Sequence, residues 1–142
     1  MLIQTRPGKK VGKENLQMCR SASEWSIGVR MGQHEQSIHH AYQALIKESK
    51  NFIYIENQFF MGIENKIVEC LADRIIKAVH GGEKFRVIVV MPLLPGFEGD
   101  MADPNSTVLR IQVHHQFQAI LRDKEKSLYA RIRKSVGDIN IK

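Results

Sequence analysis

The chain has 142 residues, of which 43% are hydrophobic and 25% are charged, and its formal net charge is +6. This length suits one compact domain, or one half of a larger domain, and is too short for two ordinary domains. No stretch contains the roughly 18 uncharged apolar residues of a membrane-spanning helix, and the N-terminus lacks the apolar centre of a signal peptide. We therefore expect a soluble intracellular protein.

The excess of positive charge favours contact with anionic surfaces, such as acidic lipid headgroups or nucleic acid, and charge alone does not choose between them. Cys19 and Cys70 have neither the spacing of metal ligands nor that of a redox motif. We expect no disulfide, and both cysteines are expected to be ordinary small core residues.

The first part of the chain is predicted to contain little regular structure. Residues 1–15 combine four cations with two glycines and a proline, which is typical of a flexible basic leader. We predict a short strand over 16–20, followed by a loop over 21–32 that Trp25 anchors. Residues 16–142 are expected to form the folded domain.

Two amphipathic helices and two apolar strands are predicted next. Ser37 is a suitable N-cap for a helix that ends near Lys50, and a second helix over 64–80 is stopped by Gly81 and Gly82. The apolar runs 52–55 and 85–91 do not alternate with polar residues. Such runs indicate strands that are covered on both faces.

The C-terminal third is predicted to contain two more helices, one over 109–121 and a shorter one around 128–132 that Gly137 closes. Residues 138–142 alternate polar and apolar side chains, which indicates a strand. Strands and helices therefore alternate along the chain. This order predicts an α/β fold, a layered sheet with helices on both faces.

Three polar residues, Glu56, Asn57 and Gln58, directly follow the first of the two apolar strands. The carboxyl end of a strand is where the sheet of an α/β protein usually opens into its functional crevice. We therefore predict that these residues form the rim of a site.

Four segments are specific enough to compare with known families. They are RS at 20–21 with WSIG at 25–28, SIHHAY at 37–42, FIYIENQFF at 52–60 and PLLPGFEGD at 92–100. In order and spacing they resemble the phospholipase D superfamily, and within it the phosphoinositide-stimulated eukaryotic enzymes. The resemblance implies hydrolysis of the phosphodiester of phosphatidylcholine-type lipids, or its transfer to another alcohol, giving phosphatidic acid without a metal or cofactor.

In this family, two copies of His-x-Lys-x-x-x-x-Asp supply a histidine nucleophile, a histidine acid and phosphate-binding lysines. Here, no histidine is followed by lysine two positions on; those positions hold Gln36, Ala41, Tyr42, Gly82, Gln116 and Phe117. Neither motif is present, so we assign no catalytic residue. We expect a fragment that lies between the two motifs, is inactive by itself and has the remaining half of the domain as its partner.

The resemblance also implies roles for two sets of polar residues. Glu56, Asn57 and Gln58 are expected to line the headgroup pocket or to brace the catalytic residues; the alternative is that they only cap backbone groups. A basic face that binds an acidic phosphoinositide is expected from Arg74, Lys77, Lys84 and Arg86. Each cation near a membrane contributes about 1 kcal/mol, and the alternative is a solvated helix face.

Further hypotheses concern partners, location and metal binding. The chain is expected to be cytoplasmic and peripheral to membranes, and a non-catalytic module that binds acidic phospholipid membranes is the alternative function. Binding of a specific nucleic acid is not expected, because no recognisable motif is present. A metal site at the pairs His39-His40 or His114-His115 is not expected either, because adjacent histidines point to different sides of a helix.

Overall fold

The computed structural model describes residues 10–11, 14–15, 17–28, 30–94, 96, 99–121 and 124–137. These residues form two compact units, Met1–Leu45 and Ile46–Lys142. Five helices and three two-stranded sheets are present in the described part of the chain. The predicted α/β class is confirmed.

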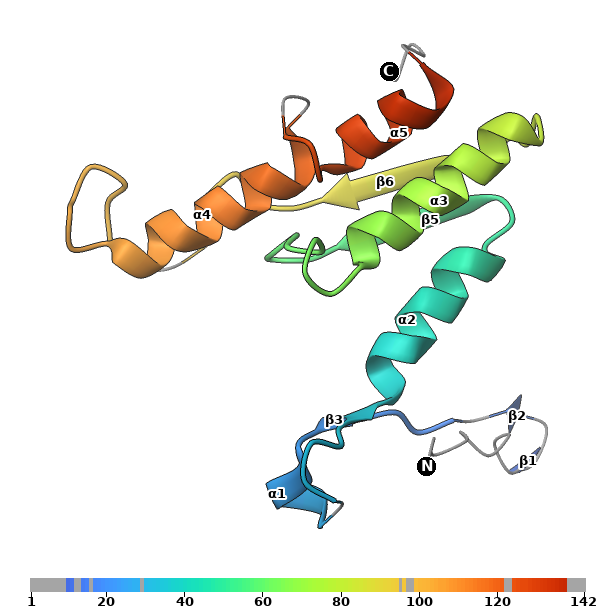
Figure 1. Ribbon diagram of the computed structural model, residues 1–142, viewed down its shortest axis with the longest axis horizontal. Coiled ribbons are helices and arrows are strands. Elements are labelled where there is room, and N and C mark those ends of the chain that lie inside the picture. The colour runs from blue at the N-terminus through green and yellow to red at the C-terminus, as the bar shows by residue number, and fades with distance from the viewer. Residues whose placement is uncertain are drawn as a thin grey trace. The chain divides into compact units, whose positions relative to one another are not determined.

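The N-terminal unit consists of short elements followed by most of one longer helix, whose residues from Ile46 on belong to the C-terminal unit (Figure 1). Two small antiparallel sheets are present, β1 with β2 and β3 with β4. The bounds are β1 (Lys10–Val11), β2 (Glu14–Asn15), β3 (Ser21–Ala22), α1 (Glu24–Ile27), β4 (Glu35–Gln36) and α2 (Ser37–Glu48). Residues 1–9 lie outside the described residues, and the flexibility expected of the leader stays a prediction.

Two predictions for this unit are wrong. The strand expected at 16–20 is found at Ser21–Ala22, and Trp25 is 86% exposed and anchors no loop. The hydroxyl of Ser37 accepts from the Arg20 N–H at 2.9 Å and donates to the Arg20 carbonyl at 3.1 Å, and its expected role as the N-cap of α2 stays a prediction. The β3–β4 pairing brings Arg20 beside Ser37 and so offers the hydroxyl both partners.

The C-terminal unit is built on a strand-helix-strand segment in which β5 and β6 are parallel. Their register runs from Phe52 opposite Arg86 to Glu56 opposite Val90. Two further helices follow. The bounds are β5 (Phe52–Glu56), α3 (Ile67–His80), β6 (Arg86–Val90), α4 (Thr107–Ile120) and α5 (Leu128–Val136). All five elements were predicted, within a few residues at their ends; the strand predicted at 138–142 lies outside the described residues.

The helices end where local chemistry predicts. The α3 helix is followed by the Gly81-Gly82 turn, and Gly137 follows α5 with a φ of 77° that suits glycine. At its other end, α5 is capped by Ser127, whose hydroxyl accepts from the Ala130 N–H at 3.1 Å.

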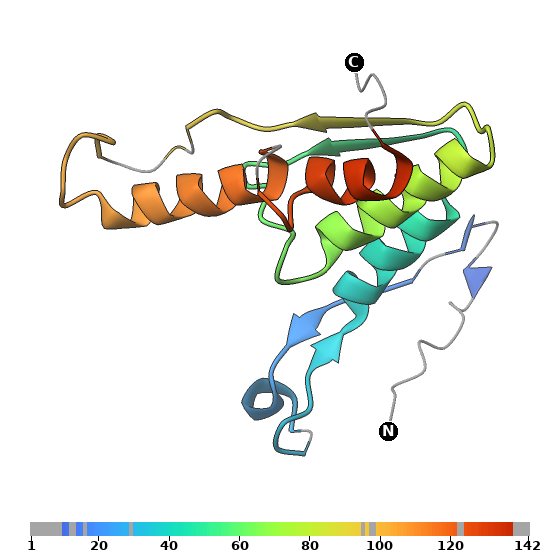
Figure 2. The ribbon, with the colours of Figure 1, turned by 45° about the horizontal axis from the view of Figure 1, so that its top comes forward.

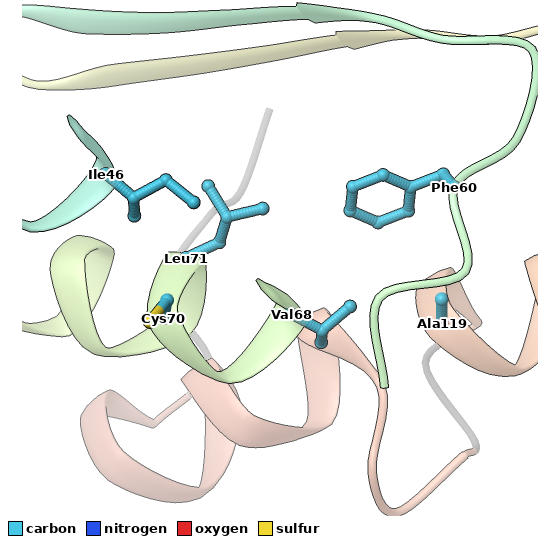
Figure 3. Close-up of a cluster of buried hydrophobic side chains, with 6 residues drawn as sticks. All are labelled: Ile46, Phe60, Val68, Cys70, Leu71 and Ala119. Atoms are coloured by element: carbon cyan, nitrogen blue, oxygen red, sulfur yellow. The ribbon is translucent and has the colours of Figure 1, made fainter. Parts of the chain in front are cut away.

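The core of this unit lies between the sheet and the helices beneath it (Figures 2 and 3). Val68 and Leu71 of α3 are fully buried, and burial of such side chains contributes about 1.5 to 3 kcal/mol each. The buried cluster comprises Ile46, Phe60, Val68, Cys70, Leu71 and Ala119. Ile53 and Ile55 of β5 and Val87 and Val89 of β6 pack against it. Both cysteines are free, and only Cys70 is a core residue as predicted.

The opposite face of the sheet is open. Exposed and half-buried residues alternate along both strands, and Phe52 and Tyr54 are 64% and 52% exposed. Helices were expected on both faces of the sheet. Within the described residues, they cover one face only (Figure 2). An apolar run without alternation predicts burial on two sides, but it does not say which segment supplies the second layer. We call the exposed residues Phe52, Tyr54, Glu56, Arg86, Ile88 and Val90 the open face.

Candidate functional site

The predicted rim residues lie where the two parallel strands end. Glu56 is the last residue of β5, and the Asn57 N–H donates to the Val90 carbonyl at 3.1 Å, so the ladder continues one step beyond β5. Because β5 and β6 are parallel, the segments that follow them leave the same edge of the sheet. Glu56, Asn57 and Gln58 are all exposed at this edge.

Glu56 forms a hydrogen bond with a side chain on its own strand. The Tyr54 hydroxyl donates to Glu56 Oε2 at 2.7 Å, and both residues belong to the open face. This hydrogen bond, with smaller contributions from desolvation and from the charge of the carboxylate, raises the pKa of Tyr54 above its ordinary value. The carboxylate of Glu56 is therefore held by the phenol at the end of β5, and this bond is not a cap on a backbone group.

The side chain of Gln58 lies beside the segment that follows β6. A Cβ atom placed on Gly96 would lie 3.8 Å from Gln58 Nε2, which is ordinary van der Waals contact. The structure thus brings Gln58 close to Gly96, although 38 positions separate the two residues. Pro95 and Phe97, for which the proline and glycine chemistry of the sequence predicts a turn, lie outside the described residues.

Gln116, which was not predicted from the sequence as a site residue, connects the same two segments. Gln116 lies on α4 and is 2% exposed. Its Oε1 accepts from the Phe60 N–H at 3.5 Å, and its Nε2 donates to the Pro92 carbonyl at 2.9 Å. A signal was present in the sequence, because Gln116 occupies a position of the apolar stripe that includes Leu109 and Val113.

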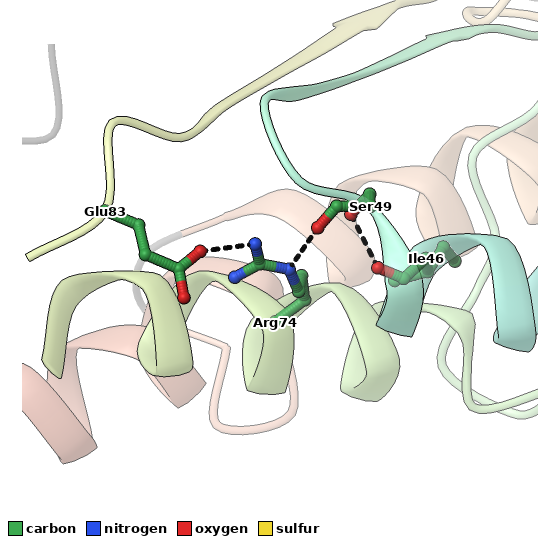
Figure 4. Close-up of polar contacts among 4 residues, drawn as sticks. All are labelled: Ile46, Ser49, Arg74 and Glu83. Atoms are coloured by element: carbon green, nitrogen blue, oxygen red, sulfur yellow. Dashed lines mark hydrogen bonds and ion pairs between the residues drawn. The ribbon is translucent and has the colours of Figure 1, made fainter. Parts of the chain in front are cut away.

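Arg74 lies inside the protein (Figure 4). It is 5% exposed, its Nε donates to the Ser49 carbonyl at 2.8 Å, and its Nη2 meets Glu83 Oε2 at 2.5 Å. Its guanidinium carbon also lies 4.0 Å from the centre of the Phe85 ring. Within the C-terminal unit, Arg74 therefore ties Ser49 and the turn before β6 to α3.

The other three predicted cations, Lys77, Lys84 and Arg86, are exposed. Arg86 lies opposite Phe52 on the open face, whereas Lys77 belongs to α3, which packs on the other face of the sheet. The four cations expected to form one basic face are thus distributed over the interior, a helix and the open face. Their binding of phosphoinositide stays a prediction.

Among the described residues, no group of three or more His, Cys, Asp and Glu side chains is placed to hold a metal ion. The rings of His39 and His40 stack 6.1 Å apart, and His39 Nε2 lies 3.1 Å from the Gln43 amide. None of the described helices combines the length and apolarity that a bilayer crossing needs.

Comparison with known proteins identifies the family. The family model for phospholipase D matches residues 9–141. The chain is 41% identical to human phospholipase D1 over 130 residues, which are 87% of this chain and 12% of that protein. It is 48% identical over 117 residues to a phospholipase D of Phytophthora infestans, covering 78% of this chain and 6% of that protein.

A plant relative gives the same result. Phospholipase D zeta 1 of Arabidopsis thaliana is 40% identical over 128 residues, which are 85% of this chain and 11% of that protein. The chain thus spans a small part of the curated relatives that it matches, and the match includes the strand-helix-strand segment and the rim. On this basis, the chain belongs to the phospholipase D family.

Proposed function

We propose that these 142 residues are an interior segment of a phospholipase D catalytic domain. The observation that carries this proposal is a family match over residues 9–141 in a chain that lacks both His-x-Lys-x-x-x-x-Asp motifs. In this proposal, the motifs that supply the nucleophile and the acid lie outside the segment. By itself the segment has no histidine and lysine pair that could form a phosphohistidine, so it is inactive.

The segment contributes the rim of the active site. The amides of Asn57 and Gln58 are exposed at the sheet edge and can donate to phosphate oxygens or to the carbonyls of a lipid. Glu56 is suited to a cationic headgroup or to bracing a catalytic side chain, because its carboxylate would repel a phosphate. The substrate is a phosphatidylcholine-type phosphodiester, and hydrolysis or transfer to another alcohol gives phosphatidic acid or its ester.

The protein is cytoplasmic and acts at the membrane surface as a peripheral protein. The net charge of +6 favours an anionic bilayer, and the exposed Lys77, Lys84 and Arg86 are the cations offered to a phosphoinositide. Arg74 supports this region from inside, since Ser49 and Glu83 occupy its guanidinium.

A chimera tests the catalytic proposal. Residues 9–141 replace the matching segment of human phospholipase D1, and phosphatidic acid release from phosphatidylcholine vesicles is measured, with ethanol added to detect transfer. We expect an active chimera, no product from the 142-residue chain alone, and reduced activity in the chimera with Gln58→Ala. An inactive chimera that is folded, or turnover by the isolated chain, would contradict the proposal.

The second candidate is a non-catalytic module that binds acidic membranes, which the exposed lysines favour. Co-sedimentation of the isolated chain with vesicles that contain phosphoinositide measures it. Binding is expected to weaken in the double variant Lys77→Ala with Lys84→Ala, and to weaken less in the matched double variant Lys47→Ala with Lys126→Ala. Equal binding by both variants would leave only a nonspecific charge effect and would exclude the module.

A further inference from the structure

The amide of Gln116 joins the two segments that leave the sheet at the rim. Among the described residues, the last backbone hydrogen bond between these segments is the one from Asn57 to Val90. Beyond it, Phe60 and Pro92 are connected through Gln116, which accepts from one and donates to the other. Gln116 is 56 positions from Phe60 and 24 from Pro92, so this is a tertiary contact.

The surroundings of Gln116 are apolar. Phe60 is 4% exposed, and Val113 and Ala119 on the same helix are 5% and 0% exposed. A leucine would pack at this position of the helix without any need for partners. A polar side chain buried here is stable only when its hydrogen-bonding groups are satisfied, and a low dielectric strengthens the bonds that it makes.

We propose that Gln116 is a positioning residue that fixes the rim by holding the Phe60 and Pro92 backbones at a set separation. This inference rests on the proposed function, because it assumes that the rim contacts substrate. A neutral amide offers an acceptor and a donor at the same time on two separate atoms, and it does so over the whole ordinary pH range. Methionine has similar length and neither group, and ionised glutamate can accept from Phe60 but cannot donate to Pro92.

The rim residues lie within a few positions of these two anchors. Gln58 is two residues before Phe60, and Gly96, which Gln58 approaches, is four residues after Pro92. Releasing either anchor changes the positions of groups that must meet the substrate. A displacement of about 1 Å at a reacting centre lowers turnover by as much as roughly 100-fold.

The test uses the chimera with human phospholipase D1 and the variants Gln116→Met and Gln116→Glu. For Gln116→Met we expect kcat to fall by roughly 10- to 100-fold, with a smaller change in KM. For Gln116→Glu we expect a pH-dependent defect. Burial raises the pKa of a carboxyl group, so at low pH the protonated acid donates to Pro92 as the amide does, and the ionised form loses that bond as pH rises.

The control is Gln118→Met, two residues further along α4. Its amide lies 3.3 Å from His114 Nε2 on the same helix, and it is expected to keep the activity of the unsubstituted chimera. A variant that merely fails to fold would not regain activity at low pH, so the recovery of Gln116→Glu relative to the unsubstituted chimera separates positioning from misfolding.

The outcomes are distinguishable. A selective loss of kcat in Gln116→Met together with the acid recovery of Gln116→Glu would support the positioning role. Unchanged kcat in Gln116→Met, or a Gln116→Glu defect that is constant with pH, would overturn it while the active chimera still supports the proposed function. An inactive unsubstituted chimera would instead overturn the proposed function, and the positioning role with it.

Discussion

The burial of Arg74 leads to a quantitative prediction about stability. Removing its head group with Arg74→Met keeps an apolar side chain of similar length and deletes the contacts to Ser49, Glu83 and Phe85. A hydrogen bond from a charged group contributes about 1.5 to 3 kcal/mol, and a cation over an aromatic ring contributes about 0.5 to 2 kcal/mol.

Two features of the site reduce this sum. The Glu83 side chain is 36% exposed, so water stabilises its charge when the arginine is gone and the ion pair adds little. Nη1 of Arg74 is also buried without a hydrogen-bond partner among the described residues, which offsets part of the gain. We expect Arg74→Met to lower the free energy of unfolding by about 2 to 3 kcal/mol.

Urea unfolding of the 142-residue chain, followed by far-UV circular dichroism, measures this effect. The expected loss corresponds to a midpoint lower by about 1 to 2 M. Arg74→Lys keeps the charge but cannot reproduce the planar fork, so it is expected to lie between Arg74→Met and the unsubstituted chain.

The matched control is Lys77→Ala, an exposed position on the same helix, with an expected change within about 0.5 kcal/mol. If Arg74→Met unfolds at the same urea concentration as the unsubstituted chain, the contacts of Arg74 do not stabilise the fold. Loss of phosphoinositide vesicle binding at unchanged stability would instead show Arg74 to be a ligand-binding cation.

Three further predictions test local contacts. The phenol of Tyr54 is expected to ionise at a pH above 10.0, because its hydrogen bond to the carboxylate of Glu56 favours the protonated form. Ionisation is followed by the absorbance at 295 nm, and Glu56→Gln should lower the pH at which it occurs. Ser127→Ala should destabilise α5 by about 1 kcal/mol in urea unfolding, because the buried N-cap hydroxyl is lost. Gly99→Ala should destabilise by about 1 to 3 kcal/mol, because φ is 124° and the added Cβ would meet the Ser106 hydroxyl.

Each of these predictions has a matched control. Tyr54→Phe identifies the Tyr54 contribution to the absorbance. If Glu56→Gln leaves the Tyr54 titration unchanged, the hydrogen bond to Glu56 is contradicted. Ser135→Ala changes an exposed serine of α5 and should leave the urea midpoint in place. Ser106→Ala should recover part of the loss in Gly99→Ala, and no recovery would mean that the backbone conformation alone is responsible.

The helices and strands of the C-terminal unit could be predicted because their determinants are local. The spacing of Val68, Leu71 and Ala72 indicates the buried face of α3, and these residues are buried. Glycine and serine at the helix ends act through neighbouring backbone groups, as at Ser127 and Gly137. The position of the rim after β5 also follows from the order of strand and polar residues.

The unpredicted features depend on contacts between distant positions. Arg74 resembles the exposed cations that follow it in sequence, and only the folded chain brings Ser49, 25 residues away, to its guanidinium. The contacts of Gln116 and the exposure of the open face likewise depend on which distant segments meet. A single sequence specifies periodicity and turn chemistry, whereas the partner of a buried polar group and the cover of a sheet face depend on which distant segments pack together. The sequence by itself therefore determined the elements of the C-terminal unit, the family and the sheet edge at which Glu56, Asn57 and Gln58 lie, and the tertiary structure decided which polar side chains are exposed and which hold the fold together.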